Sequence, residues 1–462
     1  LHELENGIAN EAFKKLPGDD KTASTFGKRN KIEKETGLKS FDFGKQVGEK
    51  VEQINTAYND FTQMPETTTK EIEVKRKAYQ TLITGDNWQI LKTLSNIKTA
   101  QFFIPKTLAQ REYLITDSIY RDMLSSGSLS RESGTISRAN AVADGKRFFH
   151  WYLEFPEVFF EGGFNLLIGN PPFLGGKKIS THYGDRYLTY LKYYFEPIKG
   201  PTCDLVAYFL RRDHIITREG GFVSLITTNT ISQGETRHGS LDYIMDQKSQ
   251  IISANRLVKW PGKASVFISQ VIIYNGTWKQ NKYLDGKTVQ YISPYFDDID
   301  IPIRKPFSLD KNSGLAFKGS LVLGLGFTIK ENEAKEYIAR NPTYSNALFP
   351  YLNGADLNRS PIQEPSRWVI NFNNKGEFEC KDLYPELYER VEKLVKPERV
   401  ILKDKGYREK WWQFARRGVA LYEAISGINK VLVSCTVTKH PSWTFNNSNI
   451  VFDIATSVVA ND

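Results

Sequence analysis

Cysteine is scarce in this sequence, with three residues among 462. Cys203, Cys380 and Cys435 lie far apart and in no paired spacing, which argues against a zinc site or a disulfide framework and fits a reducing cytoplasm. Long hydrophobic runs are also missing, because the longest, residues 266–274, is about half a membrane span and contains polar residues. No signal peptide is visible. We therefore expect a cytoplasmic protein with no bound metal and no membrane partner.

Acidic residues are outnumbered by basic ones, 53 against 62, which gives a formal net charge of +9. A basic protein suits a polyanionic partner, although charge alone is weak evidence. It gains weight where basic residues lie beside aromatic ones and a possible ligand pocket, as they do at Lys177-Lys178 and in residues 408–417. The hydrophobic share of 40% describes a soluble globular protein, and the length allows two or three domains.

Asn170-Pro171-Pro172-Phe173 directly follows the apolar run 164–169, which we read as a buried strand. The two prolines remove two backbone donors and fix φ, so the Asn170 side chain and the Pro171 carbonyl form a stiff pair of hydrogen-bond acceptors. Phe173 offers a face for stacking. Such a loop suits a planar ring that carries an amine, such as a base turned out of DNA. With Pro at about 5% of residues, the pattern arises by chance in roughly half a percent of chains of this length, and the alternative is an ordinary Pro-rich turn.

A family resemblance follows from this motif. Gly169 to Phe173 after a strand resembles the catalytic motif of adenine-N6 DNA methyltransferases. The wider stretch from Phe149 to Lys178 is similar to the Eco57I-type methylase domain of single-chain restriction-modification enzymes and phage-defence methylases. The similarity continues through residues 349–358 and 410–414, so it covers most of the chain.

The resemblance implies an enzyme that moves a methyl group from S-adenosylmethionine to N6 of an adenine flipped out of double-stranded DNA. Asn170 and Pro171 would then accept hydrogen bonds from the amine, Pro172 would stiffen the loop and Phe173 would stack on the base. Phe209 matches a residue that lines the donor's adenine pocket, although a core aromatic on an amphipathic helix explains it equally well.

Further candidate DNA contacts come from basic and aromatic residues elsewhere. Lys177 and Lys178 are candidates for holding phosphates, with a plain solvated loop as the alternative. In the last part of the chain, the candidates are Trp411, Trp412, Arg416 and Arg417, with packing of the two tryptophans the stronger alternative. His150 and His182 fit structural histidines better than catalytic bases.

The expected fold class is α/β, with a Rossmann-like class I methyltransferase parallel sheet that is only partly present in this chain. Residues 1–147 read as mostly helical, 148–280 as the C-terminal part of the catalytic core, 281–325 as a connector, and 326–462 as an incomplete target-recognition domain of mixed α+β type. Strands are expected at 164–169, 222–227, 251–258 and 266–274, and a helix at 204–216. Because ligands bind at the carboxyl ends of parallel strands, the Asn170 loop lies where the chemistry needs it.

One expected element is missing. Adenine methyltransferases of this motif order carry a Gly-rich donor loop upstream of the Asn-Pro-Pro motif, and residues 1–169 contain no strand followed by such a loop. We therefore expect a fragment, or one half of a split enzyme, whose partner is the other half or another defence-system subunit. The rival interpretation is a DNA-recognition subunit without turnover. A nuclease activity is a third interpretation, but the sequence has no Asp/Glu-x-Lys motif on a convincing strand.

Overall fold

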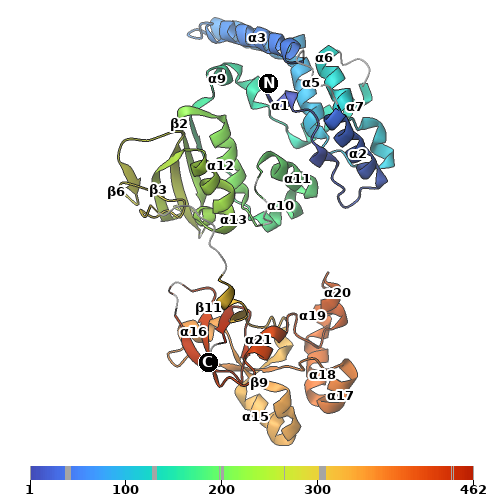
Figure 1. Ribbon diagram of the computed structural model, residues 1–462, viewed down its shortest axis with the longest axis vertical. Helices are drawn as coiled ribbons and strands as arrows, with labels where there is room; N and C mark the ends of the chain where they lie inside the picture. Colours follow the sequence, from blue (N-terminus) through green and yellow to red (C-terminus); the bar gives the residue numbers. More distant parts are fainter. Residues whose placement is uncertain are drawn as a thin grey trace. The chain divides into compact units, whose positions relative to one another are not determined.

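The computed structural model describes residues 2–36, 43–126, 133–196, 198, 202–264, 266–300, 309–438, 440 and 442–460. It divides into two compact units, residues 1–303 and 304–462, which are described separately (Figure 1). In the described part of the chain, every helix is too short or too polar for a membrane span. No set of three or more His, Cys, Asp or Glu side chains in these ranges is arranged to ligate a metal ion.

Unit 1 begins with a helical region that has its own core. Leu91, Leu94 and Ile97 lie on one face of α5 and are buried, as their helical spacing predicts. Helix α4 begins with the capping box of Thr68 and Glu71. The helices are α1 (His2–Glu5), α2 (Lys21–Thr36), α3 (Phe43–Thr62), α4 (Thr69–Thr84), α5 (Asp86–Ala100), α6 (Asp117–Ser126), α7 (Ser133–Lys146), α8 (Trp151–Glu154) and α9 (Pro156–Phe160).

A six-stranded sheet follows, in the order β1-β2-β4-β3-β5-β6. The strands are β1 (Phe164–Gly169), β2 (Thr217–Thr228), β3 (Gln250–Lys259), β4 (Phe267–Tyr274), β5 (Lys282–Leu284) and β6 (Lys287–Val289). The β1–β2 and β3–β5 pairs are parallel, whereas β4 runs antiparallel to both of its neighbours. All four strands expected from the sequence exist, but the expectation of a parallel sheet needs correction, because the sheet is mixed.

The helices of this part lie after β1 and after β2. They are α10 (Gly176–Tyr183), α11 (Asp185–Tyr194), α12 (Leu205–Ile216), α13 (Gly234–Arg237) and α14 (Tyr243–Asp246). Asp204 caps α12 by accepting a hydrogen bond from the Val206 amide at 3.1 Å. Val206 and Leu210 of α12 pack on Val223 and Leu225 of β2, and Figure 1 shows this helix lying along the strands. The crossover from β1 through α12 to β2 aligns the carboxyl ends of the two strands at one edge.

Unit 2 contains two four-stranded sheets, ordered β13-β9-β10-β8 and β12-β11-β14-β7. Its strands are β7 (Ala316–Lys318), β8 (Thr328–Ile329), β9 (Leu348–Leu352), β10 (Arg367–Ile370), β11 (Lys430–Cys435), β12 (Thr444–Asn447), β13 (Val451–Phe452) and β14 (Thr456–Val459). Its helices are α15 (Glu331–Arg340), α16 (Gly354–Arg359), α17 (Glu377–Leu383), α18 (Pro385–Leu394), α19 (Lys396–Val400), α20 (Lys405–Glu409) and α21 (Val419–Ala424). The mixed α and β content expected for residues 326–462 is therefore present.

Candidate active site

The Asn170 loop leaves β1 at the carboxyl edge of the sheet and continues to the start of α10. Pro171 is buried, whereas Asn170, Pro172 and Phe173 are exposed, Phe173 to 38%. The Asn170 side chain makes no hydrogen bond within the described part of the chain. The buried proline thus anchors a loop in which one amide and one ring are exposed, and the base-binding role expected for this loop stays a prediction.

Asp204 ties this loop to the start of α12. Its Oδ1 accepts a hydrogen bond from the Leu174 amide at 3.3 Å, while the Leu205 amide donates to the Leu174 carbonyl at 2.9 Å. The Asp204 amide in turn donates to Thr236 Oγ1, at 3.2 Å, in the segment after β2. The Asn170 loop, the start of α12 and the segment after β2 are therefore held together at the carboxyl edge of the sheet.

Gly176, the first residue of α10, lets this helix touch the chain just before α12. A Cβ at this position would lie 2.7 Å from the Cys203 amide nitrogen, closer than real Cβ contacts come. Cys203 therefore packs against the start of α10, directly after the Asn170 loop. The thiol is 1% exposed, and burial raises its pKa to about 12, so it is protonated at neutral pH and is no nucleophile.

Lys177 and Lys178 are exposed in the first turn of α10, beside the loop. Neither forms an ion pair among the described residues, so both ammonium groups remain available to an anion. His182 is exposed on the same helix, and its Nδ1 lies 2.9 Å from the Lys178 carbonyl. His150 lies in the helical region, with Nε2 2.8 Å from Asn96 Oδ1. Burial and the nearby Lys92 ammonium lower the pKa of His150 to about 4, so it is neutral near pH 7 and structural, as expected.

Phe209 is 37% exposed and lines a cavity of about 550 Å³ between the helical region, α11 and α12. The cavity wall is mainly aromatic: Phe103, Phe148, Phe149, Trp151, Tyr152, Phe159, Tyr183, Tyr187, Tyr190, Tyr194, Phe195 and Tyr208. Lys146, Arg147 and Arg212 add positive charge to it. The core packing considered for Phe209 is therefore wrong, because its ring faces open space. Its predicted role in holding the donor stays a prediction.

Trp260 belongs to the same edge and was missed from the sequence. Strand β3 runs parallel to β2, because both are antiparallel to β4, so Trp260 follows β3 at the carboxyl edge. It is half-buried, and its amide donates to the Val266 carbonyl at 3.0 Å, closing the β3–β4 hairpin. The sequence signal was present, since an aromatic residue and a proline follow a strand here, as they do at Phe173.

A second missed feature is the cluster formed by Arg237, His238 and Asp242 after β2. Arg237 is buried, stacks 3.8 Å above the Tyr295 ring centroid and pairs with Asp242 at 3.1 Å. His238 remains partly exposed, and its Nδ1 lies 2.6 Å from Asp242 Oδ2. The five residues 238–242 form a π-helical turn, a rare conformation that frequently marks functional sites. The cluster holds one imidazole in a fixed orientation near the carboxyl edge.

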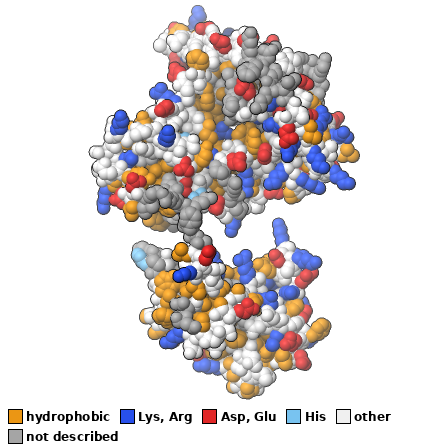
Figure 2. All heavy atoms as spheres, in the orientation of Figure 1, with side chains coloured by type: hydrophobic (Ala, Val, Ile, Leu, Met, Phe, Trp, Pro, Cys, Tyr) orange, Lys and Arg blue, Asp and Glu red, His pale blue; other side chains and the backbone are white. Residues whose placement is uncertain are grey.

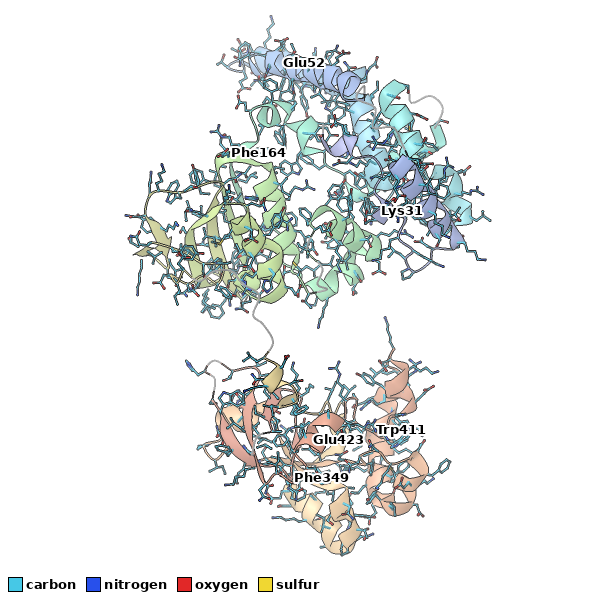
Figure 3. All side chains as sticks on the ribbon, viewed as in Figure 1. Lys31, Glu52, Phe164, Phe349, Trp411 and Glu423 are labelled. Atoms are coloured by element: carbon cyan, nitrogen blue, oxygen red, sulfur yellow. The ribbon has the colours of Figure 1, made fainter. Side chains whose placement is uncertain are left out.

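Unit 2 contains the other residues predicted to contact DNA, and for two of them this prediction is wrong. Trp411, which is labelled in Figure 3, and Trp412 are 4% and 9% exposed and belong to the hydrophobic core of unit 2. Trp412 Nε1 donates to the Lys375 carbonyl at 3.2 Å, which satisfies its polar atom inside the unit. The packing alternative is therefore confirmed for both rings. Arg416 is exposed, whereas Arg417 is half-buried and donates to the Asn374 side chain.

Residues 77–267 match the sequence model of the Eco57I restriction-modification methylase family. The matched segment contains the Asn170 loop, α10 to α12 and the strands β1 to β3. The predicted resemblance is thus confirmed for residues 77–267, whereas its extension to residues 349–358 and 410–414 lies outside the match and stays a prediction. No curated protein matches the chain.

Two solved structures are among those similar to this chain. The Type IIL restriction-modification enzyme MmeI, solved in complex with DNA, has 17% sequence identity and a TM-score of 0.49, over 64% of this chain and 41% of that chain. The type IIG restriction endonuclease BpuSI has 10% identity and a TM-score of 0.25, over 96% and 68%. This chain therefore spans less than half the length of MmeI.

Proposed function

We propose that residues 148–280 are the base-binding part of a site-specific DNA methyltransferase that acts on adenine N6 in a cytoplasmic restriction-modification or phage-defence system. The observation that carries this proposal is the Asn170 loop. Its buried Pro171 fixes an exposed amide and an exposed ring at the carboxyl edge of the sheet, inside a segment that matches a methylase family.

The exocyclic amine of adenine is a poor nucleophile, because its lone pair is delocalised into the ring. Hydrogen bonds from that amine to Asn170 Oδ1 and to the Pro171 carbonyl favour the pyramidal nitrogen of the transition state. Phe173 stacks on the flipped base and holds it in line for transfer. The sulfonium of S-adenosylmethionine supplies the methyl group. When the donor is bound, its sulfonium methyl would pass to the amine that Asn170 Oδ1 and the Pro171 carbonyl hold, and the proton that the amine loses would leave to solvent.

The described residues fit this donor only in part. Phe209 offers an exposed aromatic face at the cavity between α11 and α12, which suits an adenine ring. No strand precedes β1 in the described ranges, however, so they hold no strand-loop-helix unit upstream of the Asn170 loop. This observation favours a second candidate function, a DNA-recognition subunit that binds a base without turnover.

Basic residues at two places support DNA as the partner. Lys177 and Lys178 extend from the turn that follows the Asn170 loop, where they can reach the phosphates that flank a flipped base. Arg416 is exposed in unit 2, which we propose as the target-recognition domain. We infer that the first set fixes the position of the duplex and that unit 2 chooses the sequence.

Methyl transfer from labelled S-adenosylmethionine to DNA tests the proposal, with the chain alone and with the polypeptide encoded upstream of it. In whichever of these assays shows methyl transfer, Asn170→Ala abolishes the transfer. The affinity for DNA stays within about threefold of that of the unchanged chain, because the Asn170 side chain acts mainly in the transition state. Asn59→Ala, at an exposed position of α3, is the matched control and leaves both unchanged. Full transfer by Asn170→Ala refutes the proposed role, and loss of DNA binding assigns the loop to structure instead.

A further inference from the structure

Unit 2 contains an open cavity of about 730 Å³ beside the end of helix α16. Its walls come from two segments that are distant in sequence, the end of α16 with the turn after it and the loop that follows β11. The lining includes Arg359, Gln363, Thr438 and His440, and none of its described residues is a carboxylate. The cavity therefore suits a ligand that carries negative charge and offers hydrogen-bonding groups.

The side chain of Asn358 ties the two walls together. Its Nδ2 donates to Cys435 Sγ at 3.4 Å and to the Val437 carbonyl at 3.3 Å, both in the segment at the end of β11. Further along this wall, Thr438 Oγ1 donates to the His440 carbonyl at 2.9 Å. The walls are thus fixed before a ligand binds, which lowers the entropy cost of binding.

The turn at residues 360–363 is rigid and holds one residue in an uncommon conformation. The Gln363 amide donates to the Ser360 carbonyl at 3.2 Å, and Pro361 restricts the backbone inside the turn. Gln363 Nε2 donates to the Leu357 carbonyl at 3.2 Å. The φ of Gln363 is 54°, in the left-handed region that few residues other than glycine adopt. Such conformations concentrate at binding sites, where the surrounding structure holds them in place.

The rim of the cavity exposes side chains that have no partner in unit 2. Ile362, inside the turn, is 72% exposed, and Val437 on the other wall is 78% exposed. Arg359 is exposed and forms no ion pair or hydrogen bond among the described residues. Figure 2 shows hydrophobic side chains at the surface of unit 2, with lysine and arginine side chains near them. A free guanidinium beside exposed aliphatic groups on a rigid frame indicates a contact surface.

We propose that this cavity and its rim are the surface of unit 2 that reads the DNA sequence, with Arg359 as a specificity-determining residue. The Arg359 guanidinium donates two hydrogen bonds to O6 and N7 of a guanine in the major groove, and Ile362 contacts the methyl group of a thymine beside it. This inference rests on the proposed function, in which unit 2 chooses the sequence to be methylated.

The charge of the cavity decides between DNA and other occupants. Arg359 and His440 line it without a described carboxylate, which favours a polyanion. A second copy of the chain would place two such cavities against each other, and like charges across an interface disfavour that contact.

Selection from duplexes of random sequence tests the inference without methyl transfer. The 462-residue chain retains the duplexes that it binds, and sequencing them gives its preference at each base pair. Arg359→Ala lowers the preference for guanine at one base pair by at least about tenfold, because the two hydrogen bonds to that base are lost. The preferences at other base pairs change little. The melting temperature stays unchanged, because Arg359 is exposed and has no polar partner among the described residues.

Arg359→Lys separates base reading from a contact with phosphate. Lysine keeps the positive charge but lacks the planar fork that bonds both guanine atoms. We expect the affinity and its salt dependence to be retained, while the preference for guanine stays at least about threefold below that of the unchanged chain. Lys381→Ala, at an exposed position of α17, is the matched control and leaves every preference unchanged.

Equal sequence preferences of Arg359→Ala and the unchanged chain overturn the inference. It is also overturned if the unchanged chain selects no sequence, or if Arg359→Ala weakens binding to all duplexes equally and Arg359→Lys restores it in full. A preference that depends on Arg359, without methyl transfer in the assay of the Asn170 loop, supports the inference and refutes the proposed function. Methyl transfer at a sequence that Arg359→Ala leaves unchanged overturns the inference alone, so the two failures are distinguishable.

Discussion

Gly176→Ala offers the sharpest test of how the Asn170 loop is held. The added methyl group would lie 2.5 Å from the Thr202 carbonyl carbon and 2.7 Å from the Cys203 amide nitrogen. Ordinary contacts of a Cβ begin at 3.4 Å, so α10 and the start of α12 must separate by nearly an ångström. Both contacts are backbone, which cannot turn aside as a flexible side chain does. The separation strains the hydrogen bonds of Leu174 with Asp204 and Leu205, which tie the loop to α12.

Overpacking a tight interior typically costs 1–3 kcal/mol, and a backbone clash belongs at the upper end, so we expect a loss of about 3 kcal/mol. Urea unfolding of the 462-residue chain measures it, with hydrogen exchange of β1 and α12 separating unit 1 from unit 2. In the methyl-transfer assay proposed above, the rate falls as well, by about a hundredfold, because the loop moves from its proposed position beside the base.

Gly175→Ala is the matched control. A Cβ at Gly175 meets nothing within 4 Å, and this glycine has a φ of −55°, which any residue adopts. We expect its stability to stay within about 0.5 kcal/mol of the unchanged chain. If Gly176→Ala is as stable and as active as Gly175→Ala, the packing of α10 against residues 202–203 does not position the loop, and the account of the site is wrong.

Three other predictions concern single side chains. Because His150 has a folded pKa of about 4 against about 6.5 unfolded, only the unfolded state binds its proton between these values, so stability falls with acidification. In urea unfolding, the free energy of unfolding should fall by about 2 kcal/mol less between pH 7 and pH 4.5 in His150→Gln than in the unchanged chain. An equal fall in both proteins contradicts this prediction. Thermal unfolding should show that Trp411→Ala destabilises unit 2 by about 4 kcal/mol, because the ring is removed from the core. A variant that is as stable as the unchanged chain but binds DNA more weakly would contradict the burial of Trp411. Lys177→Ala should lower the salt dependence of DNA binding by about one ion in titrations, whereas an unchanged slope excludes a phosphate contact.

The elements around the site could be predicted because their local signals agree with the fold. The apolar run before Asn170 has a length typical of a strand and forms β1, although the predicted burial of this strand is wrong, because Leu166 and Ile168 are 49% and 75% exposed. Asp204 precedes an apolar pattern of helical period and caps α12. The stiffness of the Asn170 loop follows from its two prolines, whereas the role of Asn170 and Phe173 in binding a base stays a prediction.

The mixed sheet was not predicted, although the sequence carried a signal for it. A parallel return requires a crossover of a dozen or more residues, and residues 260–266 between β3 and β4 are too few. The pair therefore forms a hairpin, which reverses β4 and leaves Trp260 at the carboxyl edge.

The burial of Trp411 and Trp412 had no local signal. Aromatic residues beside Arg416 and Arg417 suit a packed core slightly better than a DNA-facing surface, but the sequence alone does not decide between the two. The choice depends on residues distant in sequence, such as Lys375, whose carbonyl accepts the Trp412 hydrogen bond. Such long-range partners are invisible to periodicity and composition.

Nucleoside mass spectrometry shows directly whether the Asn170 loop methylates adenine at N6. DNA incubated with S-adenosylmethionine, the 462-residue chain and the polypeptide encoded upstream is digested and analysed for methylated bases. We predict N6-methyldeoxyadenosine, and none when Asn170→Ala replaces the unchanged chain. Methylation of cytosine alone, or N6-methyldeoxyadenosine formed equally by Asn170→Ala, would contradict the assignment of the Asn170 loop as an adenine-methylating site.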